Sequence, residues 1–276
     1  MKNIFVPTDF SKCAHNATLF AMHLAKSIGA KVHLYHSVPI FAGIDNNVYN
    51  AMYIEDYHES RKHKIESVKT LLEKNEDFQG VEIEVLFSIG PSVQNIIEES
   101  EKHHADLIVM GTHGASGLTE LFLGSFTANT LAHSKIPVLA IPENFHYSKM
   151  SENFVFAADF DTYEMNKKSK DALKTLADTF QAHLKIVHVT EDKMSADKEE
   201  EEQIADYFKK IPHKFYYLKS SNIAEAINKF SEEMDASLIA TVSHKLTFID
   251  RIFFRSVSKN IAYHSHIPLL TLYEIS

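Results

Sequence analysis

Residues 105–143 read ADLIVMGTHGASGLTELFLGSFTANTLAHSKIPVLAIPE, and residues 236–274 read ASLIATVSHKLTFIDRIFFRSVSKNIAYHSHIPLLTLYE. The two stretches align without a gap at an offset of 131, and 13 of the 39 positions are identical. The starts of the halves also match, because Asn3–Phe10 (NIFVPTDF) aligns with Asn153–Phe160 (NFVFAADF). An internal repeat of this size predicts two homologous domains rather than one large barrel. We expect them at residues 1–145 and 152–276.

Each half alternates short apolar runs with longer stretches of helical spacing. In the first half we expect strands at 2–8, 32–38, 81–87, 106–110 and 138–141. We expect a first helix that Ser11 caps and Gly29 ends, and further helices at 53–75, 93–101 and 125–132. In the second half we expect strands at 154–158, 184–189, 214–218, 238–242 and 269–272, and helices at 164–180, 199–209, 222–232 and 255–263. This alternation predicts an α/β fold with two tandem, doubly wound, Rossmann-like parallel sheets of five strands, related by a pseudo-twofold axis. Ligands of such sheets bind at the carboxyl ends of the strands.

The amino-acid composition of the chain argues against several kinds of ligand and partner. The 28 Lys and Arg residues are outnumbered by 37 Asp and Glu, and the net charge of −9 gives no overall support for binding nucleic acid or an anionic membrane. The single cysteine, Cys13, excludes an internal disulfide framework and a Cys-rich zinc site. No apolar run reaches about 18 residues, and the start of the chain lacks a signal-peptide pattern, so we expect a cytoplasmic protein.

The most informative segment follows the fourth expected strand. It reads Gly111-Thr112-His113-Gly114, then nine residues, then Gly124-Ser125. Glycines permit positive φ angles and close approach of a ligand to the backbone. Ser125 opens a helix whose free N–H groups and dipole favour an anion such as a phosphate. A simple turn without a phosphate is the alternative. The chain has no GxxxxGK[ST] P-loop and no GxGxxG after its first strand.

At these residues the chain resembles the universal stress protein family, whose adenine-nucleotide-binding members carry the signature Gly-x2-Gly-x9-Gly-(Ser/Thr). Gly111, Gly114, Gly124 and Ser125 match it at every position. The segments 6–11 (VPTDFS), 34–36 (LYH) and 136–139 (IPVL) are also typical of the family. The resemblance implies that the first half binds ATP, or else AMP or ADP, with Mg²⁺ carried on the phosphates.

The resemblance also implies roles for individual residues. The three glycines and Ser125 would hold the triphosphate, and Asp9 would lie by the ribose or adenine. Ser37 would border the adenine at a position where the family usually has Val. The other residues expected to line the cleft are Pro7, Thr8, Met110, Phe126 and Thr127. His113 aligns with His244 of the second half, and we expect it to orient the loop or a phosphate.

The second half departs from the signature. Val242, Lys245 and Arg255 replace the three glycines, whereas Asp159 and Ser256 are kept. Side chains at the glycine positions would fill the space that phosphates need, or forbid the required backbone angles. We therefore expect that this half does not bind ATP in the same way. It is either a structural partner of the first half or, through its two basic residues, a pocket for a smaller anion.

Several other residues admit two interpretations. Asp9 is either a general base or metal ligand or, as we favour, an acceptor for ligand hydroxyls or a helix cap. Cys13 is either a reactive thiol at a helix start or, as we favour, a small core residue. The first half carries an insertion relative to the second, and its residues 41–57 are a lid, an inter-subunit contact or a loop packed on its own domain. Among the 17 histidines no local spacing identifies a metal site, so we assign none.

The expected function is nucleotide-dependent switching in stress or metabolic signalling. The loop between Gly111 and Ser125 contains no Lys or Arg, so any hydrolysis should be slow, and we assign no catalytic residue. Two alternatives stay open: a slow ATPase or adenylating enzyme, and a nucleotide-free scaffold that binds another small ligand. The sequence also leaves open association into a homodimer or with a protein partner.

Overall fold

The first five strands form a parallel sheet. The computed structural model describes residues 1–38, 48–90, 92–114, 124–158, 165–190, 198–243 and 266–273. The strands of its first half run parallel in the order β3-β2-β1-β4-β5. They are β1 (Asn3–Pro7), β2 (Lys31–Val38), β3 (Ile83–Ile89), β4 (Leu107–Gly111) and β5 (Val138–Ile141).

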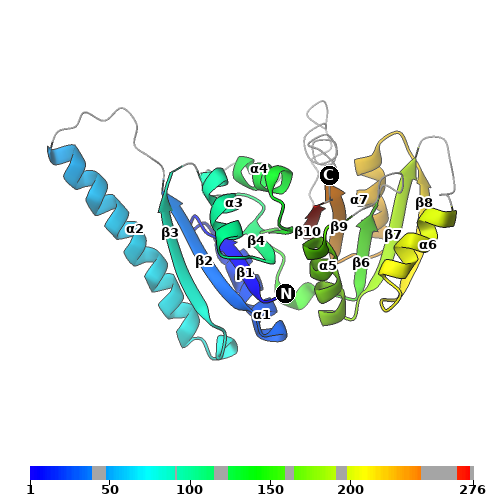
Figure 1. The fold of residues 1–276 in the computed structure, drawn as a ribbon, viewed down its shortest axis with the longest axis horizontal. Coiled ribbons are helices and arrows are strands. Elements are labelled where there is room, and N and C mark those ends of the chain that lie inside the picture. Colours follow the sequence, from blue (N-terminus) through cyan, green and yellow to red (C-terminus); the bar gives the residue numbers. More distant parts are fainter. Residues whose placement is uncertain are drawn as a thin grey trace.

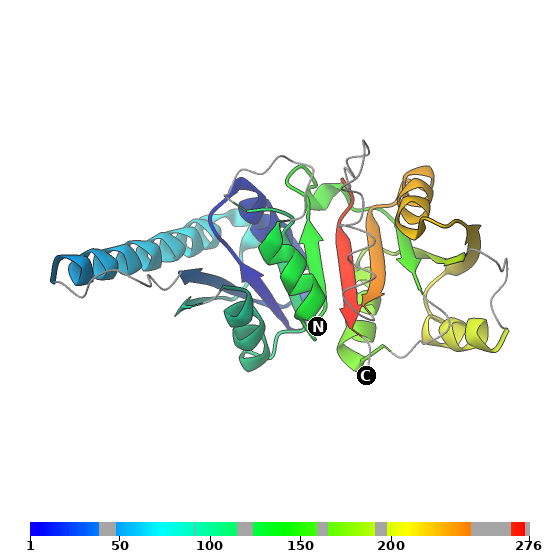
Figure 2. The ribbon, with the colours of Figure 1, turned by 90° about the horizontal axis from the view of Figure 1, so that it is seen from above.

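The second half has the same strand order as the first, but it runs in the opposite direction along the sheet. Its strands are β6 (Asn153–Ala157), β7 (His183–Thr190), β8 (His213–Lys219), β9 (Leu238–Ser243) and β10 (Leu269–Tyr273), arranged β10-β9-β6-β7-β8 and again parallel. The edge strands β5 and β10 pair antiparallel, with Leu270 opposite Leu139. The halves thus share one ten-stranded sheet (Figures 1 and 2).

A pseudo-twofold axis between two equivalent parallel sheets makes their adjoining edge strands run antiparallel, as β5 and β10 do. The predicted fold class is therefore confirmed. The shared sheet was not predicted. The domain limits 1–145 and 152–276 stay a prediction, because the structure joins both halves without a break in the sheet.

Helices cover both faces of the sheet. They are α1 (Lys12–Ile28), α2 (Val48–Lys74), α3 (Ser92–Lys102), α4 (Ser125–His133), α5 (Lys167–Thr179), α6 (Lys198–Tyr207) and α7 (Ile223–Glu233), with short 3-10 turns at Glu76–Phe78 and Tyr147–Lys149. The helix predicted at 255–263 lies outside the described residues. None of the helices in the described ranges combines the length and the apolar character needed to cross a membrane.

Alternate residues of each strand face different cores. Val6 and Leu34 join the core on the side of α1 and α2, whereas Phe5 and Tyr35 join the core on the side of α3 and α4. A strand buried on both faces needs apolar residues at nearly every position, which explains the unbroken runs in the sequence.

The local signals at α1 predict both of its ends. The Ser11 hydroxyl accepts a hydrogen bond from the backbone N–H of Ala14, at 3.1 Å, and caps the helix. At the other end Gly29 adopts a left-handed conformation, with φ of 67°. Helix α1 therefore begins directly after the end of β1, which places its first turn beside the carboxyl edge of the sheet.

Helix α2 begins five residues earlier than predicted. Its first turns extend past the edge of the sheet (Figures 1 and 2), and Met52 and Tyr53 are 59% and 65% exposed. Residues 48–57 of the insertion are thus helical and do not cover the rest of the fold. Residues 41–47 lie outside the described residues, so the lid and contact alternatives for them stay predictions.

Strand β4 ends where it touches the backbone of α1. A Cβ atom at Gly111 would lie 2.7 Å from Cys13 Sγ and 2.9 Å from the Cys13 carbonyl carbon. Real Cβ atoms do not approach backbone so closely, because the packed interior cannot yield without strain. The first glycine of the loop is therefore required by the fold itself.

We predict that Gly111→Ala destabilises the ligand-free protein by about 1–3 kcal/mol through overpacking. Thermal and urea unfolding measure this loss. Adding Cys13→Ala should restore part of it, because one of the two clashing atoms is removed while the backbone carbon stays. A melting temperature unchanged by Gly111→Ala would show that β4 and α1 are less tightly packed than described.

Candidate functional site

A cavity of about 290 Å³ opens at the carboxyl ends of β1, β2 and β4. All twelve residues named from the sequence line it. Pro7, Thr8 and Asp9 end β1, Ser37 lies near the end of β2, Met110 and Gly111 end β4, His113 and Gly114 begin the loop, and Gly124, Ser125, Phe126 and Thr127 begin α4. The residues 115–123 between these last two groups lie outside the described residues.

Four further residues line the cavity and were not assigned to it from the sequence. They are Ala14, Tyr35, His36 and Ile96. Tyr35 and His36 belong to the segment 34–36 that is typical of the family, and they precede Ser37, which the resemblance assigned to the cleft. Ala14 and Ile96 come from α1 and α3, and only the packing of those helices on the sheet brings them to the cavity.

The first turn of α4 presents bare backbone to the cavity. Its N-cap residue is Gly124, which has no side chain to cap the helix. The first N–H groups of a helix lack partners within the helix, and Gly124 offers no side chain to pair with them. The Thr127 hydroxyl donates to the carbonyl oxygen of Gly111 at 2.7 Å and so fixes this helix start against the end of β4. The arrangement is that of a helix terminus able to bind an anion.

Asp9 is held in a tight turn after β1. Its Oδ1 accepts from the backbone N–H of Ser11 at 2.9 Å, and the Thr8 hydroxyl accepts from the N–H of Phe10 at 3.1 Å. Phe10 itself has a φ of 66°, an uncommon conformation for a bulky residue. These bonds fix the carboxylate at the cavity wall and are consistent with the favoured interpretation of Asp9 as an acceptor.

The three glycines are needed for close approach and not for special backbone angles. None of them has a left-handed φ. A Cβ at Gly114 would lie 2.5 Å from Asp9 Oδ2, and a Cβ at Gly124 would lie 3.2 Å from His113 Cα. The sequence offered two reasons for glycine at these positions, namely special backbone angles and lack of space. Only the lack of space applies, and the protein's own atoms limit that space.

The corresponding positions of the second half are mostly outside the described residues. This holds for Asp159, His244, Lys245, Arg255 and Ser256. Val242, which aligns with Gly111, is buried in β9. The loss of the site in the second half therefore stays a prediction from the sequence.

His113 uses both ring nitrogens within the protein. Its Nε2 lies 3.0 Å from Glu143 Oε2, and its Nδ1 lies 3.2 Å from the Thr112 hydroxyl. Because Glu143 follows β5, this side chain ties the loop to the neighbouring strand. The geometry favours the loop-orienting role over direct contact with a phosphate.

His36 is buried at the cavity wall with one nitrogen unsatisfied. Its Nδ1 lies 2.7 Å from the carbonyl oxygen of Thr8, an arrangement in which Nδ1 donates and Nε2 is left as an acceptor. No described residue hydrogen-bonds to Nε2. Burial lowers the pKa of His36, so the ring is neutral near pH 7. The phenyl ring of Phe10 packs on it at 4.4 Å between ring centres.

Cys13 lies behind the cavity and is fully buried. Its Sγ is 3.5 Å from the carbonyl oxygen of Ile141, and burial raises the pKa of the thiol. A thiol with a raised pKa is mostly protonated near pH 7 and reacts slowly. The interpretation of Cys13 as a small core residue is the one this environment supports.

Comparison with known proteins finds the same protein family in both halves. The model of the universal stress protein family matches residues 1–142 and 190–272. Universal stress protein MJ0531 of Methanocaldococcus jannaschii is 32% identical over 142 residues, which are 51% of this chain and 81% of that protein. Universal stress protein MJ0577 of the same organism is 29% identical over 156 residues, covering 51% of this chain and 94% of its own.

A solved structure extends the similarity to the whole fold. The crystal structure of a universal stress protein from Archaeoglobus fulgidus covers 99% of this chain and 96% of its own, with a TM-score of 0.72 at 22% identity. Together with the family match over more than half of the residues, this shows that the chain belongs to the universal stress protein family.

Proposed function

We propose that the cavity binds an adenine nucleotide, and that the protein acts as a nucleotide-dependent switch in stress or metabolic signalling. The observation that carries the proposal is the meeting of the uncapped start of α4 with the carboxyl ends of β1 and β4 in one cavity. Parallel α/β sheets bind their ligands at this edge, and an uncapped helix start favours a phosphate there.

The phosphate end of the ligand would lie against Gly114, Gly124 and Ser125. The Gly124 N–H already donates to the carbonyl oxygen of Thr112 at 2.7 Å, so the N–H groups offered to a phosphate are those of the first turn of α4, where the helix dipole favours negative charge. The fit needs a slender anion, since the glycines leave little room between the loop and Asp9. Mg²⁺ would be carried on the phosphates of ATP, where it neutralises part of their charge.

The nucleoside end would lie between β1 and β2. The Ser37 hydroxyl lies 3.4 Å from the carbonyl oxygen of Gly90 and accepts from Asn95 Nδ2 at 3.4 Å, so this wall offers polar groups. Met110 and Ile96 supply apolar surface for a flat ring. The unsatisfied Nε2 of His36 is an acceptor suited to an N–H or O–H donor of the nucleoside. A purely apolar ligand would leave this nitrogen unpaired.

We predict that Gly114→Lys, which introduces the residue of the second half, lowers nucleotide affinity at least tenfold. The new side chain enters the cavity beside Asp9, whose carboxylate has to move. Calorimetric titration with ATP and Mg²⁺ measures the loss. Melting without ligand should change little, because the clashing atom is the end of one side chain. Gln79→Lys, which adds the same charge at an exposed position, is the control. ATP affinity that survives Gly114→Lys would refute this site.

We predict a stoichiometry of one nucleotide per chain, because only the first half keeps the glycines. Gly114→Lys should then remove binding completely instead of halving it. In the converse experiment, Val242, Lys245 and Arg255 are changed together to Gly. A second site in that variant would show that the second half is merely blocked, whereas an unchanged value of one would show that more than the loop has been lost. Two sites in the unaltered protein would contradict the assignment to the first half.

We predict that bound ATP is released largely intact, as a switch requires. Mass spectrometry of the small molecule that co-purifies identifies the ligand, and chromatography of the bound nucleotide follows its conversion. The control is Gly124→Arg. Rapid, steady ADP release above this control would favour the ATPase alternative, and absence of any bound or binding adenine nucleotide would favour the scaffold.

A further inference from the structure

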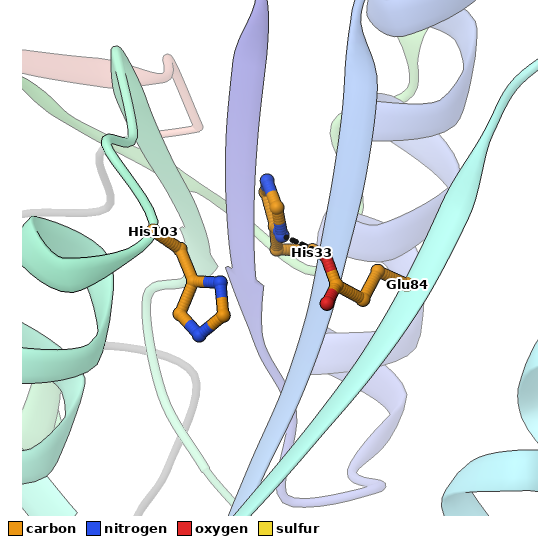
Figure 3. A group of neighbouring side chains, drawn as sticks. All are labelled: His33, Glu84 and His103. Carbon is orange, nitrogen blue, oxygen red and sulfur yellow. Dashed lines mark ion pairs between the residues drawn. The ribbon is translucent and has the colours of Figure 1, made fainter.

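A second cluster of ligand-type side chains lies away from the cavity. His33 of β2, Glu84 of β3 and His103 at the end of α3 each place one nitrogen or oxygen within 4.8 Å of the others (Figure 3). In the described part of the chain this is the one such group of three. The three residues are separated by 51 and 19 positions, so only the fold brings them together.

Strand pairing sets the first two ligands side by side. His33 and Glu84 are register partners on adjacent parallel strands. His33 Nδ1 lies 3.1 Å from Glu84 Oε2. Two ligands about 2.0–2.1 Å from a tetrahedral zinc lie about 3.3 Å apart, so this pair already has the separation of two metal ligands.

The ring nitrogen of His33 that faces away from Glu84 also has an acceptor beside it. Asn3 donates its side-chain N–H to the carbonyl oxygen of His104, at 3.4 Å, which turns its Oδ1 toward His33 Nε2, also at 3.4 Å. This acceptor can take the proton of Nε2 when Nδ1 offers its lone pair to a metal. Nδ1 is buried, and its contact with Glu84 Oε2 is not aligned as a hydrogen bond.

His103 has the same arrangement. Its Nε2 lies 3.4 Å from Glu99 Oε2, one helical turn earlier on α3. That contact leaves Nδ1 as the nitrogen available to the cluster. Histidines that bind metals commonly donate their other N–H to a carboxylate or carbonyl group, which fixes the tautomer and the ring orientation. Both histidines here carry such an acceptor.

We propose that His33, Glu84 and His103 form a binding site for a divalent transition metal of the zinc type. Two imidazoles and one carboxylate are a known zinc ligand set, with a water molecule as the fourth ligand. A simple His⁺–Glu⁻ ion pair is the competing interpretation. It accounts poorly for His33, because the contact between its Nδ1 and Glu84 Oε2 is short but is not aligned as a hydrogen bond, although the nitrogen is buried.

One cation already competes for the carboxylate. Lys31 Nζ lies 3.0 Å from Glu84 Oε2 and 2.9 Å from Glu82 Oε1. A metal would displace the ammonium from Glu84, and Lys31 would keep its contact with Glu82. The proposal therefore makes an unusual prediction: removing Lys31 strengthens metal binding, because a positive charge beside the site disappears.

The test is calorimetric titration of the full chain with Zn²⁺ after treatment with a chelator and without nucleotide. We expect one site per chain. His103→Ala and Glu84→Gln should each weaken it at least tenfold, Glu99→Gln should weaken it about tenfold as a positioning residue, and Lys31→Gln should tighten it about threefold. His103 and Glu84 are partly exposed, so their variants leave the core intact; the buried His33 is not needed for the test.

The matched control is His183→Ala. His183 also lies beside a glutamate, with Nδ1 3.9 Å from Glu152 Oε1, but belongs to no group of three in the described residues. It should leave zinc affinity unchanged. Two further readouts are the visible absorption of bound Co²⁺ and a zinc-dependent rise in melting temperature, both of which His103→Ala should abolish.

Clear results would overturn the proposal. Equal zinc affinity in the unaltered protein and in both His103→Ala and Glu84→Gln would place any bound zinc elsewhere, and no measurable binding would exclude the site. Affinity unchanged by Lys31→Gln would contradict Glu84 as a ligand. The site does not depend on the nucleotide proposal, so zinc binding should persist in Gly114→Lys.

Discussion

The candidate nucleotide site depends on three glycines at which the chain packs closely against itself. Gly111 touches the backbone of α1, Gly114 touches the carboxylate of Asp9, and Gly124 touches the loop backbone. These contacts gather the ends of β1 and β4 and the start of α4 around one small cavity. The same absence of side chains that lets the protein close on itself leaves backbone N–H groups accessible to a ligand. Fold and binding thus place the same demand on these positions, which is why a single motif in the sequence indicates both.

Much of the fold could be predicted because its signals are local. Strands buried on both faces read as continuous apolar runs, and α1 carries both its cap and its terminating glycine. The start of α2 was placed late because its first turns extend past the sheet, where Met52 and Tyr53 are exposed and no buried face imposes an apolar spacing. The joint between β5 and β10 pairs residues about 130 positions apart, such as Leu139 and Leu270, and no local pattern records it.

The candidate site shows the same division between local and distant information. Its glycines could be named because they match a family signature that lies between a recognisable strand and a helix start, and the resemblance to that family supplied the strand-end residues. Ile96 reaches the cavity only through the packing of α3 on the sheet, and a single sequence does not give that packing. The three-residue cluster at His33 is the extreme case, since metal sites are sought by short spacings and this one joins two strands and a helix.

Helix α3 connects the two candidate sites. Ile96 lines the cavity near its start, and His103 follows its last turn in the cluster with His33 and Glu84. Seven residues of helix span about 10 Å, so both sites include residues that one short, rigid helix positions. Asn95 on the same helix hydrogen-bonds to Ser88 at 3.1 Å and to Ser37 at 3.4 Å, which links α3 to the cavity wall. A metal that fixed the far end of α3 to β2 and β3 would restrict the movement of this helix. It would therefore also restrict Ile96 and Asn95, through which α3 contacts the cavity wall.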